Sequence, residues 1–323
     1  MPALMIDQRL SLADPAHWLA VQGAQIIALA EACRDLGRLE ATIASLPEAE
    51  ASGARDRLAL IEVEAMLRAQ GLMLGRDEIG REMLDARSGS DPEALRLARW
   101  AVRRLEGQGV LADLAAFLGL HRRAGADAMP GPDLELRPQG REFDAAAAEF
   151  LQAADGFGVL HPLARRPALL AAWRMAGMSL PGQMVEPAVW SARHMAAGGE
   201  GLRFVPMGRH GRRIWAGYGT PADRLAAHLA AVRAGAQDSR ALILRLRDWS
   251  GRARAATAGI KGDNAARVIA VLAARPFVSA METEARAGVS RPTAERMLKR
   301  LADLGLTRDV TGHRRFRLWT AAA

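Results

Sequence analysis

Hydrophobic residues recur at helical spacing along most of the chain. Trp18, Val21, Ile26, Leu29 and Cys33 follow one another at intervals of three to five residues, and such spacing gathers apolar side chains on one face of a helix. Comparable runs predict further helices at 36–45, 58–69, 77–86, 92–105, 141–154, 169–178, 188–196, 222–234, 239–256 and 265–274. The pattern therefore predicts a mainly α protein.

Two stretches without this pattern are expected to be loops within the helical part. The segment 47–56 reads PEAEASGARD, and the segment 125–140 holds three prolines, which disfavour regular structure. The second stretch is a candidate boundary inside a helical body that covers residues 1–250. Residues 251–262, which end in a glycine-bearing hinge at 259–262, are expected to link this body to a second domain at 263–323.

The second domain is predicted to begin with three helices. Asp263 is placed to cap the first of them, and Ser279 with Glu282 has the spacing of a capping box for the second. Gly288 supplies a turn, after which Ser290 is placed to cap a third helix that ends at Gly305. In this third helix the apolar residues Ala294, Met297, Leu298, Leu301 and Leu304 lie on one face, whereas Thr293, Arg296, Lys299 and Arg300 lie elsewhere.

After Gly305 the hydrophobic period changes from helical to two. Leu306, Arg308 and Val310 precede a turn at 311–313, and the alternation resumes up to Trp319, which predicts a β-hairpin. Two helices joined by a glycine turn and followed by a basic hairpin resemble the winged helix-turn-helix, whose second helix enters the DNA major groove. A small helical cap on an enzyme is the alternative interpretation.

The net charge of the chain is confined to its last quarter. From Gly251 onward there are 14 Lys and Arg against 6 Asp and Glu, whereas the preceding part holds 30 of each. A neutral body with a basic end favours a polyanion at one end over a protein that coats membranes along its length. Cys33 is the single cysteine and no Cys/His cluster is present, so no disulfide, metal ion or other cofactor is expected. Without a signal peptide or a bilayer-length apolar run, the protein is expected in the cytoplasm.

The order of parts resembles the Fic-like helix-turn-helix family of bacterial proteins, loosely from about Leu58 and more closely over the last sixty or so residues. This resemblance implies a Fic-like helical body followed by a winged helix-turn-helix domain. Active Fic proteins transfer AMP with a motif that begins His-Pro-Phe, continues through an acidic Mg²⁺ ligand and ends Gly-Asn-Gly-Arg. His161 and Pro162 match its opening, but Arg165 stands at the acid position.

The remaining motif positions also depart from the family pattern. Leu163 replaces the phenylalanine, and Arg166 and Ala168 replace the two glycines. Pro167 replaces the asparagine, and Leu169 replaces the arginine. A cation cannot ligate Mg²⁺, and the larger side chains would fill the space that a phosphate needs. We therefore expect no AMP transfer. His161 is then expected to be a loop or helix-start residue with a satisfied hydrogen bond.

The resulting prediction is a sequence-specific transcriptional regulator that binds double-stranded DNA and is associated with the nucleoid. The residues expected to face base edges or nearby phosphates are Arg291, Thr293, Arg296 and Arg300, and those expected mostly to meet phosphates are Lys299, His313, Arg314, Arg315 and Arg317. Ser290 is also expected among the DNA-binding residues. Pairing as a homodimer is expected by analogy with other regulators. The alternatives are a Fic-type AMP transferase and an inactive relative that acts as an interaction scaffold.

A second basic segment lies inside the body. Arg209, His210, Arg212 and Arg213 follow a glycine-rich stretch and could hold a phosphate of DNA or of a small ligand. A solvated loop explains the same residues, so both interpretations stay open at the level of the sequence.

Overall fold

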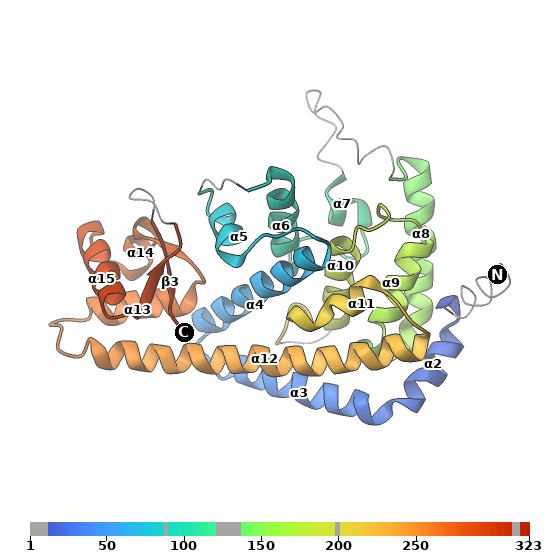
Figure 1. Cartoon of the computed structure of the whole chain (residues 1–323), viewed down its shortest axis with the longest axis horizontal. Helices are drawn as coiled ribbons and strands as arrows, with labels where there is room; N and C mark the ends of the chain where they lie inside the picture. Colours follow the sequence, from blue (N-terminus) through green and yellow to red (C-terminus); the bar gives the residue numbers. More distant parts are fainter. Residues whose placement is uncertain (1–11, 87–89, 121–136, 198–200, 312–316) are drawn as a thin grey trace.

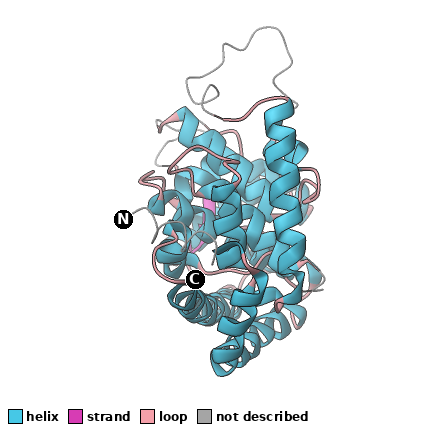
Figure 2. Ribbon diagram, turned by 90° about the vertical axis from the view of Figure 1, so that its right-hand side faces the viewer, coloured by secondary structure: helices cyan, strands magenta, loops and turns pink. Residues whose placement is uncertain are grey.

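A computed structural model describes residues 12–86, 90–120, 137–197, 201–311 and 317–323. Helices make up nearly all of its regular structure, and Figure 2 shows the strands as one small patch behind them. The mainly α fold with a small C-terminal hairpin is thus confirmed. Among the described helices, none has both the length and the apolar character that crossing a bilayer requires.

The N-terminal part, which we call the body, packs its helices around one large apolar core. Fully buried tryptophans at positions 18, 173, 190 and 215 contribute to this core. The body consists of α2 (Pro15–Ala24), α3 (Ile26–Ala44), α4 (Glu48–Ala69), α5 (Arg76–Met83), α6 (Pro92–Leu105), α7 (Leu114–Leu118), α8 (Arg141–Gly156), η3 (Phe157–Val159), η4 (Pro162–Ala164), α9 (Arg166–Met175), α10 (Val185–Ala196), η5 (Gly208–Gly211), α11 (Arg212–Ala216) and most of α12 (Pro221–Ala256).

The C-terminal region, residues 257–323, has a second and smaller core that includes Leu272, Leu298, Leu301 and Trp319. Its antiparallel sheet has the order β1-β3-β2, in which Ser279 pairs with Leu318 and Asp309 with Trp319. The sequence did not reveal β1, which is only two residues long. The elements are α13 (Asn264–Ala274), β1 (Val278–Ser279), α14 (Ala280–Ala287), α15 (Arg291–Asp303), β2 (Thr307–Asp309) and β3 (Leu318–Ala321).

A single helix, α12, replaces the two helices that were predicted at 222–234 and 239–256 (Figure 1). The predicted break between these helices, at 235–238, includes Gly235, and glycine is a poor helix former. In the structure Gly235 instead permits close packing, since a Cβ at this position would lie 2.6 Å from both the Met207 Cα and the Pro206 carbonyl oxygen. The prediction was wrong because the glycine serves a contact with a distant segment.

The expected loop at 47–56 is also wrong, because α4 already begins at Glu48. Gly53 lies within this helix and touches the backbone of Ala274, whose carbonyl oxygen would lie only 2.1 Å from a Cβ at position 53. One turn further, the Arg57 guanidinium donates to the carbonyl oxygens of Leu272 (2.6 Å), Ala273 (2.9 Å) and Arg275 (2.6 Å). These carbonyls belong to the C-terminal end of α13, where helical partners are missing. Helix α4 therefore docks the C-terminal region onto the body.

Two further contacts support this docking from α5. The Arg308 guanidinium forms a two-pronged ion pair with Asp77, with N···O distances of 2.6 and 2.8 Å. Gly80 lies against the Phe277 ring, and a Cβ at position 80 would come within 2.2 Å of it. The C-terminal region thus has a defined position at one end of the body (Figure 1).

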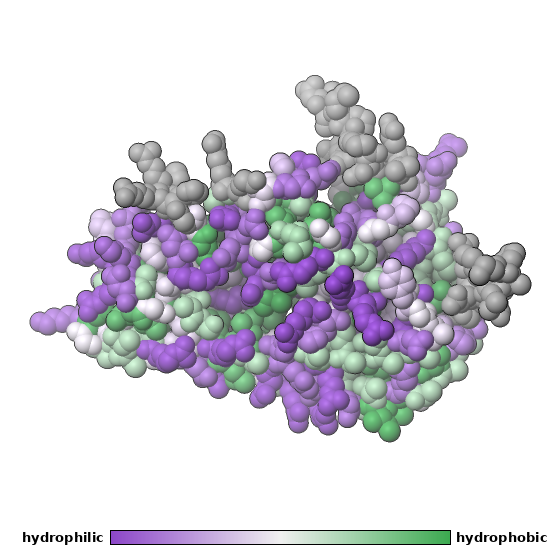
Figure 3. All heavy atoms as spheres, viewed as in Figure 1, coloured by the Kyte–Doolittle hydropathy of each residue, from purple (hydrophilic) through white to green (hydrophobic). Residues whose placement is uncertain are grey.

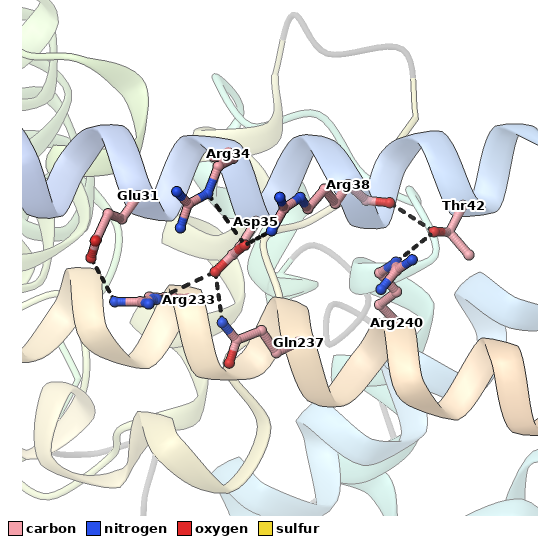
Figure 4. Close-up of polar contacts among 8 residues, drawn as sticks. All are labelled: Glu31, Arg34, Asp35, Arg38, Thr42, Arg233, Gln237 and Arg240. Atoms are coloured by element: carbon pink, nitrogen blue, oxygen red, sulfur yellow. Dashed lines mark hydrogen bonds and ion pairs between the residues drawn. The ribbon is translucent and has the colours of Figure 1, made fainter.

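Helix α3 runs alongside α12 in the same direction and is tied to it by a polar network centred on Asp35 (Figure 4). This carboxylate is only 4% exposed and accepts from Gln237 Nε2 at 2.7 Å, with Arg38 at 3.2 Å and Arg233 at 3.3 Å. Burial raises the pKa of Asp35, but the Gln237 hydrogen bond and the neighbouring arginines outweigh it and hold the pKa below its ordinary value. Helix α3 begins after a break at Gln25. The sequence pattern instead predicted that this helix begins at Leu36.

Replacing Asp35 tests this network. We expect Asp35→Asn to lower the free energy of unfolding by about 1–3 kcal/mol at neutral pH, because charge-assisted hydrogen bonds are lost in a buried place. The pKa of Asp35 is lower in the folded protein than in the unfolded chain. The stabilisation by its carboxylate is therefore fully present above the unfolded pKa and is lost as the pH falls through the folded pKa. Urea unfolding should therefore show that the difference in the free energy of unfolding between Asp35→Asn and the wild type becomes smaller below about pH 4. Glu31→Gln removes a half-buried carboxylate that pairs with Arg233 in the same network, and it is the comparison variant with a smaller expected effect.

Replacing Arg57 tests the docking contact. We expect Arg57→Met to lower the free energy of unfolding by about 2–3 kcal/mol, since three helix-end carbonyls lose a charged donor. Amide hydrogen exchange in α13 should rise in the same variant. Arg96→Met, at a 70% exposed side chain of α6, is the matched control. Unchanged exchange in α13 would contradict a holding role for Arg57.

Candidate nucleic-acid interface

The two helices of the predicted helix-turn-helix are present and joined as the sequence indicated. Ser279 Oγ accepts from the Glu282 backbone N–H at 3.0 Å, and Gly288 ends α14 in the left-handed region with φ +61°. Only half of the expected capping box forms, because the Glu282 carboxylate pairs with Arg275 (3.3 Å) and Arg286 (2.9 Å). The turn nevertheless leads directly into α15.

Helix α15 separates an apolar face from a basic one. Ala294, Leu298 and Leu301 are buried against the smaller core. Arg296, Lys299 and Arg300 are exposed to solvent. Within the described part of the chain, none of these three cations is paired with a carboxylate. This face of α15 is what a polyanion would meet.

The first turn of α15 is less free than the sequence suggested. Ser290 does not cap the helix through a backbone N–H, because its hydroxyl lies 3.0 Å from the Thr293 hydroxyl. Thr293 in turn accepts from Arg296 Nη2 at 3.2 Å. Arg291 forms an ion pair with Glu295 at 3.2 Å, one helical turn away. Glu295 is therefore a residue of this surface that the sequence analysis overlooked, although its i,i+4 spacing from Arg291 could have shown it.

The described residues include both strands of the predicted hairpin. Strands β2 and β3 pair as predicted, but His313, Arg314 and Arg315 lie outside the described residues. Arg317 is 46% exposed, with its Nε 3.5 Å from the Asp309 carboxylate and its guanidinium 6.0 Å from the centre of the Trp319 ring. It is a tethered cation that could still turn toward a phosphate.

The candidate interface lies at the end of the molecule that points away from the body (Figure 1). Figure 3 shows hydrophilic side chains along the outer edge of this end and over the middle of the edge formed by α3 and α12. The docking contacts of Arg57 and Arg308 involve α13 and β2, so they leave α15 uncovered. A duplex could therefore approach α15 without displacing the body.

The segment that matches the opening of the Fic motif is used for local structure. His161 precedes η4, where its Nδ1 accepts from the Leu163 N–H at 3.2 Å, and its Nε2 lies 3.8 Å from Cys33 Sγ. Partial burial, together with the charge of Arg165, lowers the pKa of His161, so the ring is neutral at pH 7. Arg165 donates to the carbonyl oxygens of Leu160 (2.9 Å) and Gly158 (2.8 Å). His161 is thus a helix-start residue with a satisfied hydrogen bond, as expected.

The basic segment of the body is split by its contacts. Arg209 and His210 share the carboxylate of Asp238, at 3.2 and 3.0 Å. Arg212 and Arg213 are exposed, and within the described residues neither pairs with a carboxylate. The described chain offers no group of three or more His, Cys, Asp or Glu that could hold a metal ion.

Comparison with known proteins gives a structural likeness to a solved structure. No protein-family model matches the chain, and no curated protein matches it. Among solved structures, it is similar to the crystal structure of a Fic family protein from Desulfovibrio desulfuricans G20, at 15% sequence identity and a TM-score of 0.49. The match covers 92% of this chain and 95% of that one. A likeness of this degree supports no conclusion about activity, ligand or partner.

Proposed function

We propose that this protein is a double-stranded-DNA-binding regulator of transcription that places α15 in the major groove. The observation that carries the proposal is the solvent face of α15, on which Arg296, Lys299 and Arg300 are exposed and not paired with a carboxylate within the described residues. A helix of this length fits the major groove, where arginine can bind the two acceptors of a guanine.

The remaining residues have graded roles in this proposal. Arg296 is steered by Thr293 toward the start of the helix, which is the part of a recognition helix that meets base edges. Lys299 carries a compact charge suited to a phosphate. Arg291 would first have to leave Glu295, so its contribution is expected to be smaller. The hairpin would contact phosphates of the DNA backbone through Arg317, together with His313, Arg314 and Arg315.

Two substitutions distinguish base recognition from phosphate binding. Arg296→Ala should relax preference at one base position at a cost of about 1–3 kcal/mol, whereas Lys299→Ala should weaken all sequences alike and lower the salt slope by about one. Duplexes selected from a random pool supply the specific site, and binding is measured by gel shift over a range of salt. An enriched palindrome would also support the proposed homodimer.

Arg96→Ala on the body is the matched control and should change nothing. Equal losses on specific and random duplex for Arg296→Ala would contradict its assignment to base recognition. If the wild type binds no duplex even at low salt, the interaction-scaffold alternative replaces DNA binding.

We further propose that the chain has no AMP transferase activity. This is supported by Arg165, which stands at the acid position and is held by two carbonyls, and by Ala168 and Leu169, which are buried where the motif would need an open phosphate loop. Incubation with labelled ATP and Mg²⁺ should label neither the protein nor a cell extract. Transfer that disappears in His161→Ala would overturn the proposal and favour the enzyme alternative.

A further inference from the structure

A cavity of about 730 Å³ opens between α4, the segment 206–212 and α12, away from the proposed DNA interface. Small-molecule sites in proteins typically have volumes of this order. One part of its wall is apolar and includes Leu58, Ile61, Ala65 and Leu242. Figure 3 shows hydrophilic side chains over the neighbouring region of α11. The cavity therefore combines an apolar wall with a polar rim.

Arginines dominate the charged side chains of this cavity. Arg68, Arg76, Arg209, Arg212 and Arg245 line it, against three carboxylates. Glu64 pairs with Arg76 (3.0 Å) and Arg68 (3.3 Å), and Asp238 pairs with Arg209 (3.2 Å).

Within the described residues, Arg212 and Arg245 have no carboxylate partner. They come from different elements, α11 and α12, and both line the same opening. Two guanidinium groups that line one cavity and have no carboxylate partner suit an oxyanion, because each can bind two oxygens of a phosphate or carboxylate.

The wall of the cavity also contains a buried carboxyl group with an unused atom. Glu62 is 0% exposed, and its Oε2 accepts from the N–H groups of Met207 (2.9 Å) and Gly208 (2.5 Å). Its Oε1 has no hydrogen-bond partner within the described protein, which is unusual for a buried polar atom. Burial raises the pKa of Glu62, while the charge of Arg166 opposes this shift.

We propose that this cavity binds a small organic oxyanion, a molecule with an apolar part and at least one phosphate or carboxylate group. The apolar part packs on Ile61, Ala65 and Leu242, and the oxyanion is held by Arg212 and Arg245. This site is separate from α15 and does not depend on whether the protein binds DNA.

The test uses the full chain and three probes of similar size, namely phenyl phosphate, phenylacetate and the neutral benzyl alcohol, in isothermal titration calorimetry. We expect saturable millimolar or tighter binding of at least one anion and none of the alcohol. Stronger binding of phenyl phosphate assigns a phosphate ligand, and stronger binding of phenylacetate a carboxylate ligand; both support the proposal. No saturable binding of either anion overturns it.

A pair of double variants locates the binding. Arg212→Gln with Arg245→Gln should weaken the affinity at least about tenfold, since two charge-assisted contacts are lost. Arg213→Gln with Arg247→Gln removes equally exposed arginines of the same two helices that do not line the cavity, and should leave the affinity unchanged. Equal weakening by both pairs would show non-specific charge attraction, and no weakening by the first pair would show that Arg212 and Arg245 do not hold the anion. Either result would overturn the site.

Discussion

The architecture depends on one uninterrupted helix that belongs to two cores. The 36 residues of α12 span about 54 Å. Leu229 and Val232 are buried in the large core of the body, whereas Leu246 and Trp249 are buried in the small C-terminal core. Because an α-helix is stiff over this length, packing at one end fixes the direction of the other. The close approach at Gly235 and the Asp35 network with α3 hold the body half of this helix in place.

A second constraint fixes the rotation of the C-terminal region around that helix. Helix α4 approaches the end of α13 so closely that only glycine fits at position 53, and Arg57 satisfies the carbonyls that the helix end leaves without partners. The Asp77–Arg308 pair adds a contact on the neighbouring strand. Together these contacts bury one side of the C-terminal region and direct the basic face of α15 toward solvent. The C-terminal region, held in this position, thus presents the face of α15 on which the proposed function depends.

The body itself uses many of its charged residues for internal structure. Arg165 donates to carbonyl oxygens near η4, and Arg166 is fully buried beside Glu62 and His228. Burial lowers the pKa of His228 to about 3, and the charge of Arg166 adds to this shift. Charges placed in this way hold segments together and are not open to a substrate. The cavity between α4 and α12 differs from these sites, because Arg212 and Arg245, which line it, are exposed to solvent. This contrast is consistent with the ligand that we propose for the cavity.

The sequence by itself determined the elements whose signals are local. The helix predicted at 92–105 coincides with α6 and its Asp91 cap, and the basic face of α15 follows from apolar spacing alone. The tertiary structure decided the roles of Gly53 and Gly235, which resemble loop signals until Ala274 and Met207 are seen beside them. It also decided which cations stay free, because Arg308 meets Asp77 from a distance of more than two hundred residues along the chain. Local spacing carries helical periodicity and single caps such as that of Asp91, whereas contacts between distant segments depend on how the helices pack.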